Sequence, residues 1–338
     1  MSAHHTDRKE AFSVTTSDLA PIEASVVSAP RRGGRPPAGR RSRVRLAPYL
    51  FAGPAVVLYV VFMLIPVLYA IWLSLRAYRL QAGGTFGRRV EVFVGLENYA
   101  AVLADPELLA SFGRLAIYGL IAVPLTLGLA LLFALLLDVP AVRAKRFSRT
   151  AIFIPYAVPG VVAALMWGFM YLPSTSPFSY LTEQAGWGPI PFLTGSGLFG
   201  SLANIAIWGG VGFNMIIIYT SLRGIPDELY EAARLDGANE LQIALRVKVP
   251  LVGPAILLTT VFALIGTLQL YGEPMTLKPM TNDISQTWAP LMIIYRDAFL
   301  TDNLPAAAAS STILALGTVA LSLLILGIVN RKRFGARS

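Results

Sequence analysis

The sequence predicts an all-α integral membrane protein, because it is very hydrophobic, contains six long uncharged runs and distributes its Lys and Arg residues unevenly. Of 338 residues, 55% are hydrophobic and only 14% are charged, and the mean hydropathy is +0.61. This apolar share exceeds that of an ordinary soluble domain. A lipid bilayer is therefore the expected solvent for most of the chain.

The six runs each contain at least about twenty residues without Asp, Glu, Lys or Arg, enough to cross about 30 Å of hydrocarbon. Their apolarity is continuous, whereas the strands of a membrane barrel alternate polar and apolar residues. Buried helices of a soluble protein would need polar faces, which these runs lack. We therefore expect six transmembrane helices, near residues 46–75, 115–137, 150–172, 198–222, 249–271 and 305–329.

The basic residues indicate the orientation of the chain. Residues 1–45 are rich in Pro, Gly, Ser and Arg without apolar periodicity, which predicts a disordered basic cytoplasmic tail. With six spans and a cytoplasmic amino terminus, 21 of the 28 Lys and Arg residues fall on the cytoplasmic side. The loop between the third and fourth spans, 173–197, contains none. Both termini are therefore expected in the cytoplasm. The net charge of +9 is interpreted as this signal plus attraction to membrane lipid, not as nucleic-acid binding.

The charged segment 223–250, between the fourth and fifth runs, is predicted to form an elbow of two short helices. Gly237 can adopt the left-handed conformation that ends a helix. Asn239 and Gln242 have the spacing of a variant capping box for the second helix, and Pro250 is expected to close that helix. Small residues alternate with leucines along the elbow, which would allow another molecule to approach its surface closely. An amphipathic helix lying on lipid is the open alternative.

The string "YEAARLDGA" followed by "VKVPLVGP" resembles the EAA motif of permease subunits of bacterial binding-protein-dependent ABC importers. That motif has Glu-Ala-Ala, then Asp-Gly, then a closing proline, here Pro250, with Val249 replacing the family's frequent Leu. Three further strings are similar to the carbohydrate branch: "VGLENY" at 94–99, "IPYAVPGVVAALMW" at 154–167 and "GTLQLYGEP" at 266–274. The positions that the resemblance assigns to ATPase coupling are Tyr230, Glu231, Ala232, Ala233, Asp236, Gly237 and Ala238.

The resemblance implies a type I ABC importer permease domain at 46–338, in the bacterial cytoplasmic membrane, with the elbow as its coupling helix. The implied partners are a second permease subunit, a cytoplasmic ATPase dimer that binds ATP and Mg, and an extracytoplasmic solute-binding protein. The implied substrate is a sugar or oligosaccharide, while a polyol or glycerol phosphate remains open.

The chain itself lacks features of an enzyme. It contains no GxxxxGK[ST] phosphate loop, so we expect no ATP binding or catalytic residue and no cofactor in this chain. It has no cysteine, and its only histidines are His4 and His5, so no metal site is expected. The six runs hold no charged residue for proton relay or intramembrane catalysis. Glu273 falls just beyond the fifth run. It could serve as a lone acid, but it is interpreted as a solvated loop residue or a helix end. A self-sufficient secondary carrier for an uncharged solute is the alternative function.

Polar and aromatic residues in the fourth and fifth runs are the candidates for a substrate pathway, because polar groups within a membrane usually face protein or a water-filled cavity. Amides and aromatic faces are suited to binding sugars. Hydrogen bonding between helices is the alternative role for the amides, and tight packing is the alternative for the glycines. Asn204 and Trp208 are secondary candidates. The predicted pathway residues are Gly210, Phe213, Asn214, Thr267, Gln269 and Tyr271.

Overall fold

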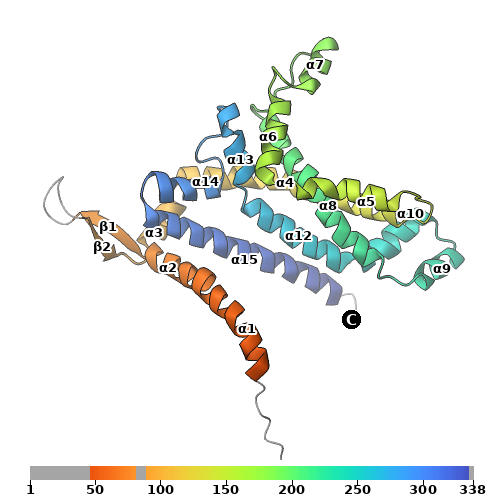
Figure 1. The fold of residues 1–338 in the computed structure, drawn as a ribbon, viewed down its shortest axis with the longest axis horizontal. Coiled ribbons are helices and arrows are strands. Elements are labelled where there is room, and N and C mark those ends of the chain that lie inside the picture. The colour runs from red at the N-terminus through yellow and green to blue at the C-terminus, as the bar shows by residue number, and fades with distance from the viewer. Residues whose placement is uncertain (1–45, 81–88, 335–338) are drawn as a thin grey trace, which may run out of the picture. The chain divides into compact units, whose positions relative to one another are not determined.

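The computed structural model describes residues 46–80 and 89–334, so the prediction of a disordered tail at 1–45 lies outside the described residues. Residues from Val56 onward form one compact unit, whose helices are drawn in Figure 1. The chain enters this unit within a helical segment composed of α1 (Leu46–Tyr59), a π-turn at Val60–Leu64 and α2 (Ile65–Ser74). Pro54 is accommodated within α1.

Five helical segments in the described residues are long and apolar enough to cross a membrane, and a bent pair of helices supplies a sixth if the pair is counted as one span. The structure therefore shows five to six candidate spans, where the sequence predicts six. The fourth segment joins α12 (Gly253–Leu268), α13 (Gly272–Leu277) and a 3-10 turn, Lys278–Met280. The five segments are Tyr49–Ser74, Pro106–Asp138 (α4), Gly197–Leu222 (α8), Gly253–Met280 and Leu304–Ile328, which lies within α15 (Leu304–Phe334).

The run at 150–172 is not one straight helix. α5 (Lys145–Phe153) continues into a 3-10 turn at Ile154–Ala157, and α6 (Gly160–Tyr171) then leaves at 95° to this first helical part. Pro155 and Pro159 explain the break, because proline lacks a backbone donor and disfavours helical conformation in the residue before it. The sequence prediction missed this bend.

A two-stranded ribbon departs from the predicted all-α fold. Strands β1 (Arg76–Leu80) and β2 (Arg89–Phe93) pair antiparallel, with Arg76 opposite Phe93. α3 (Glu97–Leu103) follows, and its Asn98 amide donates to the Ser74 and Arg76 carbonyls at 2.8 and 2.6 Å. The "VGLENY" string therefore holds the base of the ribbon against the end of α2.

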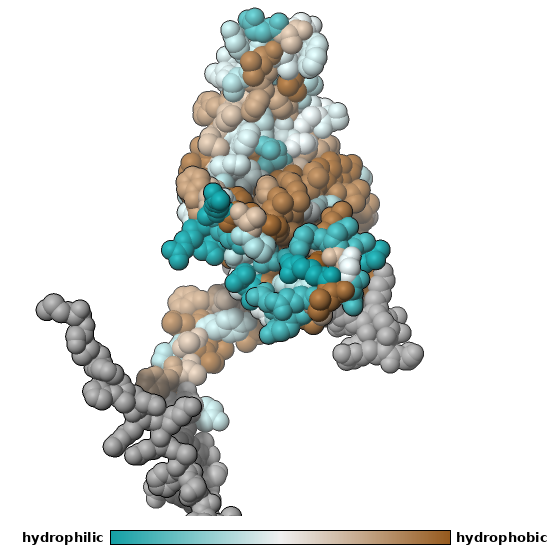
Figure 2. All heavy atoms as spheres, turned by 90° about the vertical axis from the view of Figure 1, so that its right-hand side faces the viewer, coloured by the Kyte–Doolittle hydropathy of each residue, from teal (hydrophilic) through white to brown (hydrophobic). Residues whose placement is uncertain are grey.

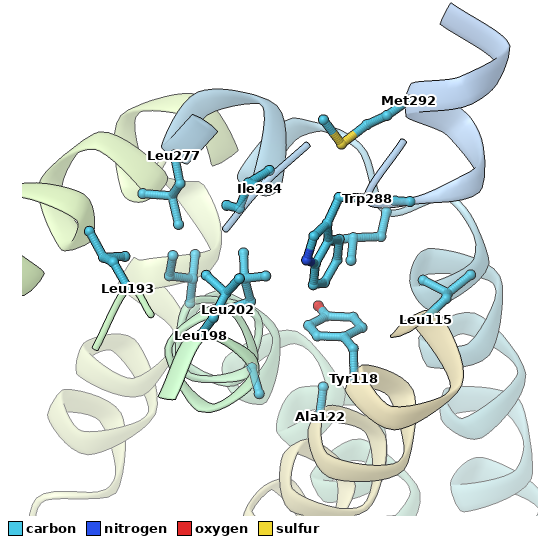
Figure 3. Close-up of a cluster of buried hydrophobic side chains, with 14 of the residues drawn as sticks. Leu115, Tyr118, Ala122, Leu193, Leu198, Leu202, Leu277, Ile284, Trp288 and Met292 are labelled. Atoms are coloured by element: carbon cyan, nitrogen blue, oxygen red, sulfur yellow. The ribbon is translucent and has the colours of Figure 1, made fainter. Parts of the chain in front are cut away.

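The centre of the unit is the packing of α4 against α8. Small residues on α4, Ala130 and Ala134, pack with Met215 and Ile218 of α8, and all four are fully or nearly fully buried. Figure 3 shows a second cluster, in which Tyr118 of α4 points toward Trp288. Half of an apolar 18-residue stretch of α8 is buried, whereas only 6% of the corresponding stretch in α15 is buried. α8 is therefore a central helix, and α15 is peripheral.

The remaining elements lie between the long helices. Arg114 of α4 donates to the carbonyls of Thr287 and Trp288 at 2.6 and 2.8 Å, which fixes the loop before α14. α14 (Pro290–Tyr295) leads through a π-turn at Arg296–Leu300 into α15. The segment between α6 and α8 carries α7 (Pro177–Gln184), whose amino end is capped by the Ser176 hydroxyl.

Candidate functional site

A cavity of about 540 Å³ lies among α4, α8, α12 and the break between α5 and α6. Its wall combines aromatic rings, hydroxyl and amide groups, small residues and one carboxylate. The lining residues that matter for the chemistry below are Tyr118, Tyr156, Gly160, Gly210, Phe213, Asn214, Thr267, Gln269 and Glu273.

Five of the six predicted pathway residues lie on the wall of this one cavity. Tyr271 does not line it, and its ring lies 5.6 Å from that of Tyr295 instead. The secondary candidates also point elsewhere. The Asn204 amide donates to the Tyr171 hydroxyl at 2.8 Å, and Trp208 packs edge-on against Trp167. The five wall residues are Gly210, Phe213, Asn214, Thr267 and Gln269.

The amides on the wall form no hydrogen bond between helices among the described residues. The Asn214 side-chain nitrogen donates to the Gly210 carbonyl of its own helix at 2.8 Å, and its Oδ1 atom is buried without a partner. Gln269 is exposed and follows the last residue of α12. This geometry leaves both amides able to bind a molecule in the cavity.

The glycines of α8 differ in how closely neighbouring elements approach them. A Cβ atom on Gly209 would meet nothing within 4 Å, whereas the tight approach of α8 to its neighbour occurs at Gly212. A Cβ atom on Gly212 would lie 2.7 Å from the Cα of Phe153 and closer still to the Ile152 carbonyl oxygen. Gly212 therefore permits close packing between α8 and the end of α5.

Two features of the wall were missed by sequence reasoning. Tyr156, in the turn between α5 and α6, stacks on Phe213 with ring centres 4.8 Å apart. Glu273 lies in the first turn of α13, a helix end as one of the two interpretations expected, and it lines the cavity, which was not predicted. The two prolines in "IPYAVPG" indicate the break that places Tyr156 here.

Replacing Gln269 with Ala is expected to lower substrate uptake about tenfold, because the cavity would lose an amide that both donates and accepts hydrogen bonds. The amount of assembled protein in the membrane should not change, since the Gln269 side chain is exposed. Initial uptake rates in cells, normalised to the membrane content of this chain, measure the effect. Asn204→Ala, which removes an amide outside the cavity, is the matched comparison. Normal uptake kinetics in Gln269→Ala would assign this side chain to helix packing.

The elbow consists of two helices joined by Gly237. α9 (Glu228–Leu235) is followed by its cap Asp236 and then by Gly237, which has φ of +82° and donates its N–H to the Arg234 carbonyl. α10 (Glu240–Ile243) begins with the expected capping box. The helical path then continues through a π-turn at Ala244–Lys248 into α11 (Val249–Leu251). Pro250 therefore lies within this path and does not close the second helix as predicted.

The outer surface of the elbow is charged and interrupted by exposed leucines (Figure 2). Arg234 forms an ion pair with Glu240 at 2.9 Å, and this hydrogen bond lowers the pKa of the Glu240 carboxyl. Leu235 is 90% exposed and Leu241 is 68% exposed. Glu231, Ala232, Asp236 and Gly237 are also exposed, while Ala233 and Ala238 are half-buried.

The root of the elbow contains a buried ion pair. Lys248 Nζ lies 2.5 Å from Oδ2 of Asp138, the last residue of α4, and both residues are under 9% exposed. The same ammonium lies 4.8 Å from the centre of the Tyr230 ring of α9. Burial raises the pKa of Tyr230, and the nearby Asp138 carboxylate raises it further. These three residues, here called the elbow joint, connect α9, the path to α12 and the end of α4.

The described residues contain no group of three or more His, Cys, Asp or Glu side chains that could hold a metal ion. The chain is thus a helical membrane protein with a cavity among its long helices and an exposed charged elbow. The family described as binding-protein-dependent transport system inner membrane component matches residues 127–333, and the chain belongs to this family. This match confirms the resemblance drawn from the EAA segment. The chain is a membrane component of a transport system rather than an enzyme.

Curated relatives extend the likeness over most of the chain. The sn-glycerol-3-phosphate transport system permease protein UgpA of Brucella suis is 31% identical over 282 residues, covering 82% of this chain and 92% of UgpA. A probable ABC transporter permease protein, YurN of Bacillus subtilis, is 30% identical, covering 83% and 94%. The fold matches a chain of a bacterial ABC transporter involved in import of the acidic polysaccharide alginate, with a TM-score of 0.71, 19% identity and coverage of 84% and 95%.

Proposed function

We propose that this chain is one of two membrane subunits of an ATP-driven importer, which moves a sugar or oligosaccharide across the bacterial cytoplasmic membrane. A solute-binding protein delivers the substrate on the outer side. A separate ATPase dimer, which binds ATP and Mg, drives transport by docking on the elbow formed by α9 and α10. Both termini and the elbow lie in the cytoplasm, as the distribution of basic residues predicts.

The observation that carries the proposal is the physical connection between the elbow and the cavity. The elbow joint links the exposed helix α9 to α4, and the helical path from α10 leads into α12. Both α4 and α12 contribute residues to the cavity wall. A displacement of α9 by a partner would therefore be transmitted to two walls of the cavity, which is the coupling that an importer requires.

The cavity supports a sugar as substrate. The stacked rings of Phe213 and Tyr156 offer an aromatic face for the apolar CH surface of a sugar ring. The Asn214 and Gln269 amides and the Thr267 hydroxyl offer donors and acceptors for its hydroxyl groups. The names of relatives support transport of polar metabolites, and they include glycerol phosphate as well as a polysaccharide.

The exposed apolar surface of this chain and the solved structures with the same fold support the proposed partner proteins. A further solved structure with the same fold, at a TM-score of 0.72 and 17% identity, is an alginate ABC transporter in complex with an alginate pentasaccharide-bound periplasmic protein. The apolar 18-residue stretches within Tyr49–Ser74 and Leu304–Ile328 are each only 6% buried. This leaves apolar surface for lipid and for a second permease subunit.

A pull-down of the tagged chain in mild detergent tests the proposal. The native chain should recover an ATPase and a second permease, and Gly237→Pro should lose the ATPase. Proline cannot adopt the positive φ of Gly237 and would remove the N–H that caps α9. Gly237→Asn is the matched control, because asparagine tolerates the left-handed conformation and retains the N–H.

We expect Gly237→Asn to retain the ATPase and at least about half of the ATP-dependent uptake, since the cost of a left-handed Asn is only about 1 kcal/mol. Recovery of the native chain alone would favour a self-sufficient carrier, with the elbow lying on lipid. Family membership favours the importer over that alternative.

A further inference from the structure

We infer that Glu273 makes the cavity selective for uncharged, hydroxyl-bearing substrates over anionic ones. The inference rests on the proposed function and deepens it, since it separates neutral sugars and polyols from phosphorylated or uronic acid substrates. Three observations support it: the position of the carboxylate, the absence of basic residues on the cavity wall, and the hydrogen-bonding groups around it.

The Glu273 carboxylate faces the cavity and is free to bind. Glu273 is half-buried on the cavity wall, in the first turn of α13, and no hydrogen bond or ion pair engages its side chain among the described residues. A Cβ atom built on Gly160 would lie 3.9 Å from Glu273 Oε1. Gly160 begins α6, so the carboxylate lies near the amino end of that helix.

No other lining residue of the cavity is charged. The Glu273 carboxyl is therefore the one acidic group on the wall, and the amino end of α6 beside it supplies only a partial positive charge. Two like charges about 6 Å apart, at an effective dielectric constant near 20, disfavour binding of an anion about 100-fold. Sites that bind phosphate or carboxylate use Arg, Lys or clustered backbone donors, and the wall has no Arg or Lys.

A neutral polyhydroxylated ligand has the complementary chemistry. An ionised carboxylate only accepts hydrogen bonds and offers about four lone-pair positions, so it can bind two neighbouring hydroxyl groups at once. Hydrogen bonds to a charged group are shorter and stronger than those between neutral groups. Gln269 lies on the same wall and can bind another hydroxyl, while Phe213 and Tyr156 cover a ring face.

The inference separates this chain from relatives named for anionic substrates. UgpA of Brucella suis is named for sn-glycerol-3-phosphate, and the first solved neighbour is described as importing an acidic polysaccharide. At 31% and 19% identity, these likenesses leave room for a different cavity lining. The charge on the wall of this chain argues against both kinds of substrate.

Thiol labelling tests the inference directly, because the chain has no native cysteine. Gly160→Cys places one thiol beside Glu273, at an exposed position where a Cβ atom has room. The purified importer complex is labelled with size-matched cationic (trimethylammonium) and anionic (sulfonate) methanethiosulfonates. The mass of the intact chain then reports the rate for each reagent. Ser174→Cys, in an exposed turn outside the cavity, supplies the reference ratio of the two rates.

The cation-to-anion rate ratio in the Gly160→Cys variant should exceed the reference at least about tenfold, because the Glu273 charge attracts one reagent and repels the other. Adding Glu273→Gln should bring the ratio close to the reference, and adding Glu273→Asp should preserve it because the charge remains. A ratio that Glu273→Gln does not change would overturn the inference.

Protection by ligands supplies a second measurement on the same variant. Glucose should slow the labelling, whereas its carboxylated counterpart glucuronate should have no effect, and Glu273→Gln should abolish that difference. Equal protection by the two ligands, or protection by neither, would also overturn the inference. Labelling needs no ATP, so loss of the ATPase in the pull-down would contradict the proposed function separately.

Discussion

Replacing Lys248 with Met should uncouple ATP hydrolysis from transport. The substitution leaves the Asp138 carboxylate buried at the end of α4 without its counter-ion, at a cost of about 3–5 kcal/mol. The carboxyl end of a helix is itself unfavourable for a negative charge, so α4 offers no compensation. The end of α4 should therefore move or take up water, and the elbow joint should loosen.

The measurement is the number of ATP molecules hydrolysed per substrate molecule imported by the reconstituted complex. We expect uptake to fall at least about tenfold while hydrolysis continues, corresponding to about 1.4 kcal/mol or more of lost coupling. The methylene groups of Met still pack near Tyr230, so the change isolates the charge.

The double variant Asp138→Leu with Lys248→Met is the control for stability. Replacing both members of a buried ion pair with apolar residues is often neutral or stabilising, so the thermal midpoint should return to the native value. Arg234→Gln breaks an exposed ion pair on the same elbow and should have little effect on stability. Native coupling in Lys248→Met would show that the elbow joint does not transmit motion.

Gly212→Ala is the second substitution expected to have a large effect. Its new methyl group would press on the backbone of Ile152 and Phe153, which cannot yield like the end of a flexible side chain. Overpacking of this kind costs about 1–3 kcal/mol. Because the displaced segment leads directly to Tyr156 on the cavity wall, uptake should fall together with stability.

Thermal unfolding of the detergent-solubilised complex, followed alongside uptake, measures both effects. Gly200→Ala lies in the same helix with nothing within 4 Å of its added methyl group, so it should be neutral or slightly stabilising. Equal thermal midpoints for Gly212→Ala and Gly200→Ala would mean that α8 does not pack tightly at Gly212.

The spans were predictable because hydrocarbon imposes a length and an apolarity that are visible in any sequence. Their interruptions were harder to predict. The prolines at 155 and 159 were apparent, but proline can also lie inside a membrane helix, as Pro124 does in α4. The β ribbon was missed because charged residues at its ends, such as Arg76 and Arg89, read as an ordinary loop between spans.

The cavity wall was partly predictable from residue type. Asn214 and Gln269 are conspicuous amides in apolar runs, and both lie on the wall. Tyr271 is only two residues from Gln269 but points away, because the chain leaves helical conformation between α12 and α13. The same break returns Glu273 to the wall. Side-chain direction at such a break depends on backbone angles that composition does not specify.

The 95° break beside the cavity also has a consequence for hydration. Non-helical backbone is tolerated at membrane depth only where protein covers it or water reaches it. Val158 is half-buried on the cavity wall and precedes Pro159, which has no N–H to donate. Water that enters the cavity would supply hydrogen-bond partners to the backbone groups that the break leaves without helical ones. A sugar entering such a cavity would replace its hydrogen bonds to water with hydrogen bonds to the wall, and it would not have to cross a dry barrier.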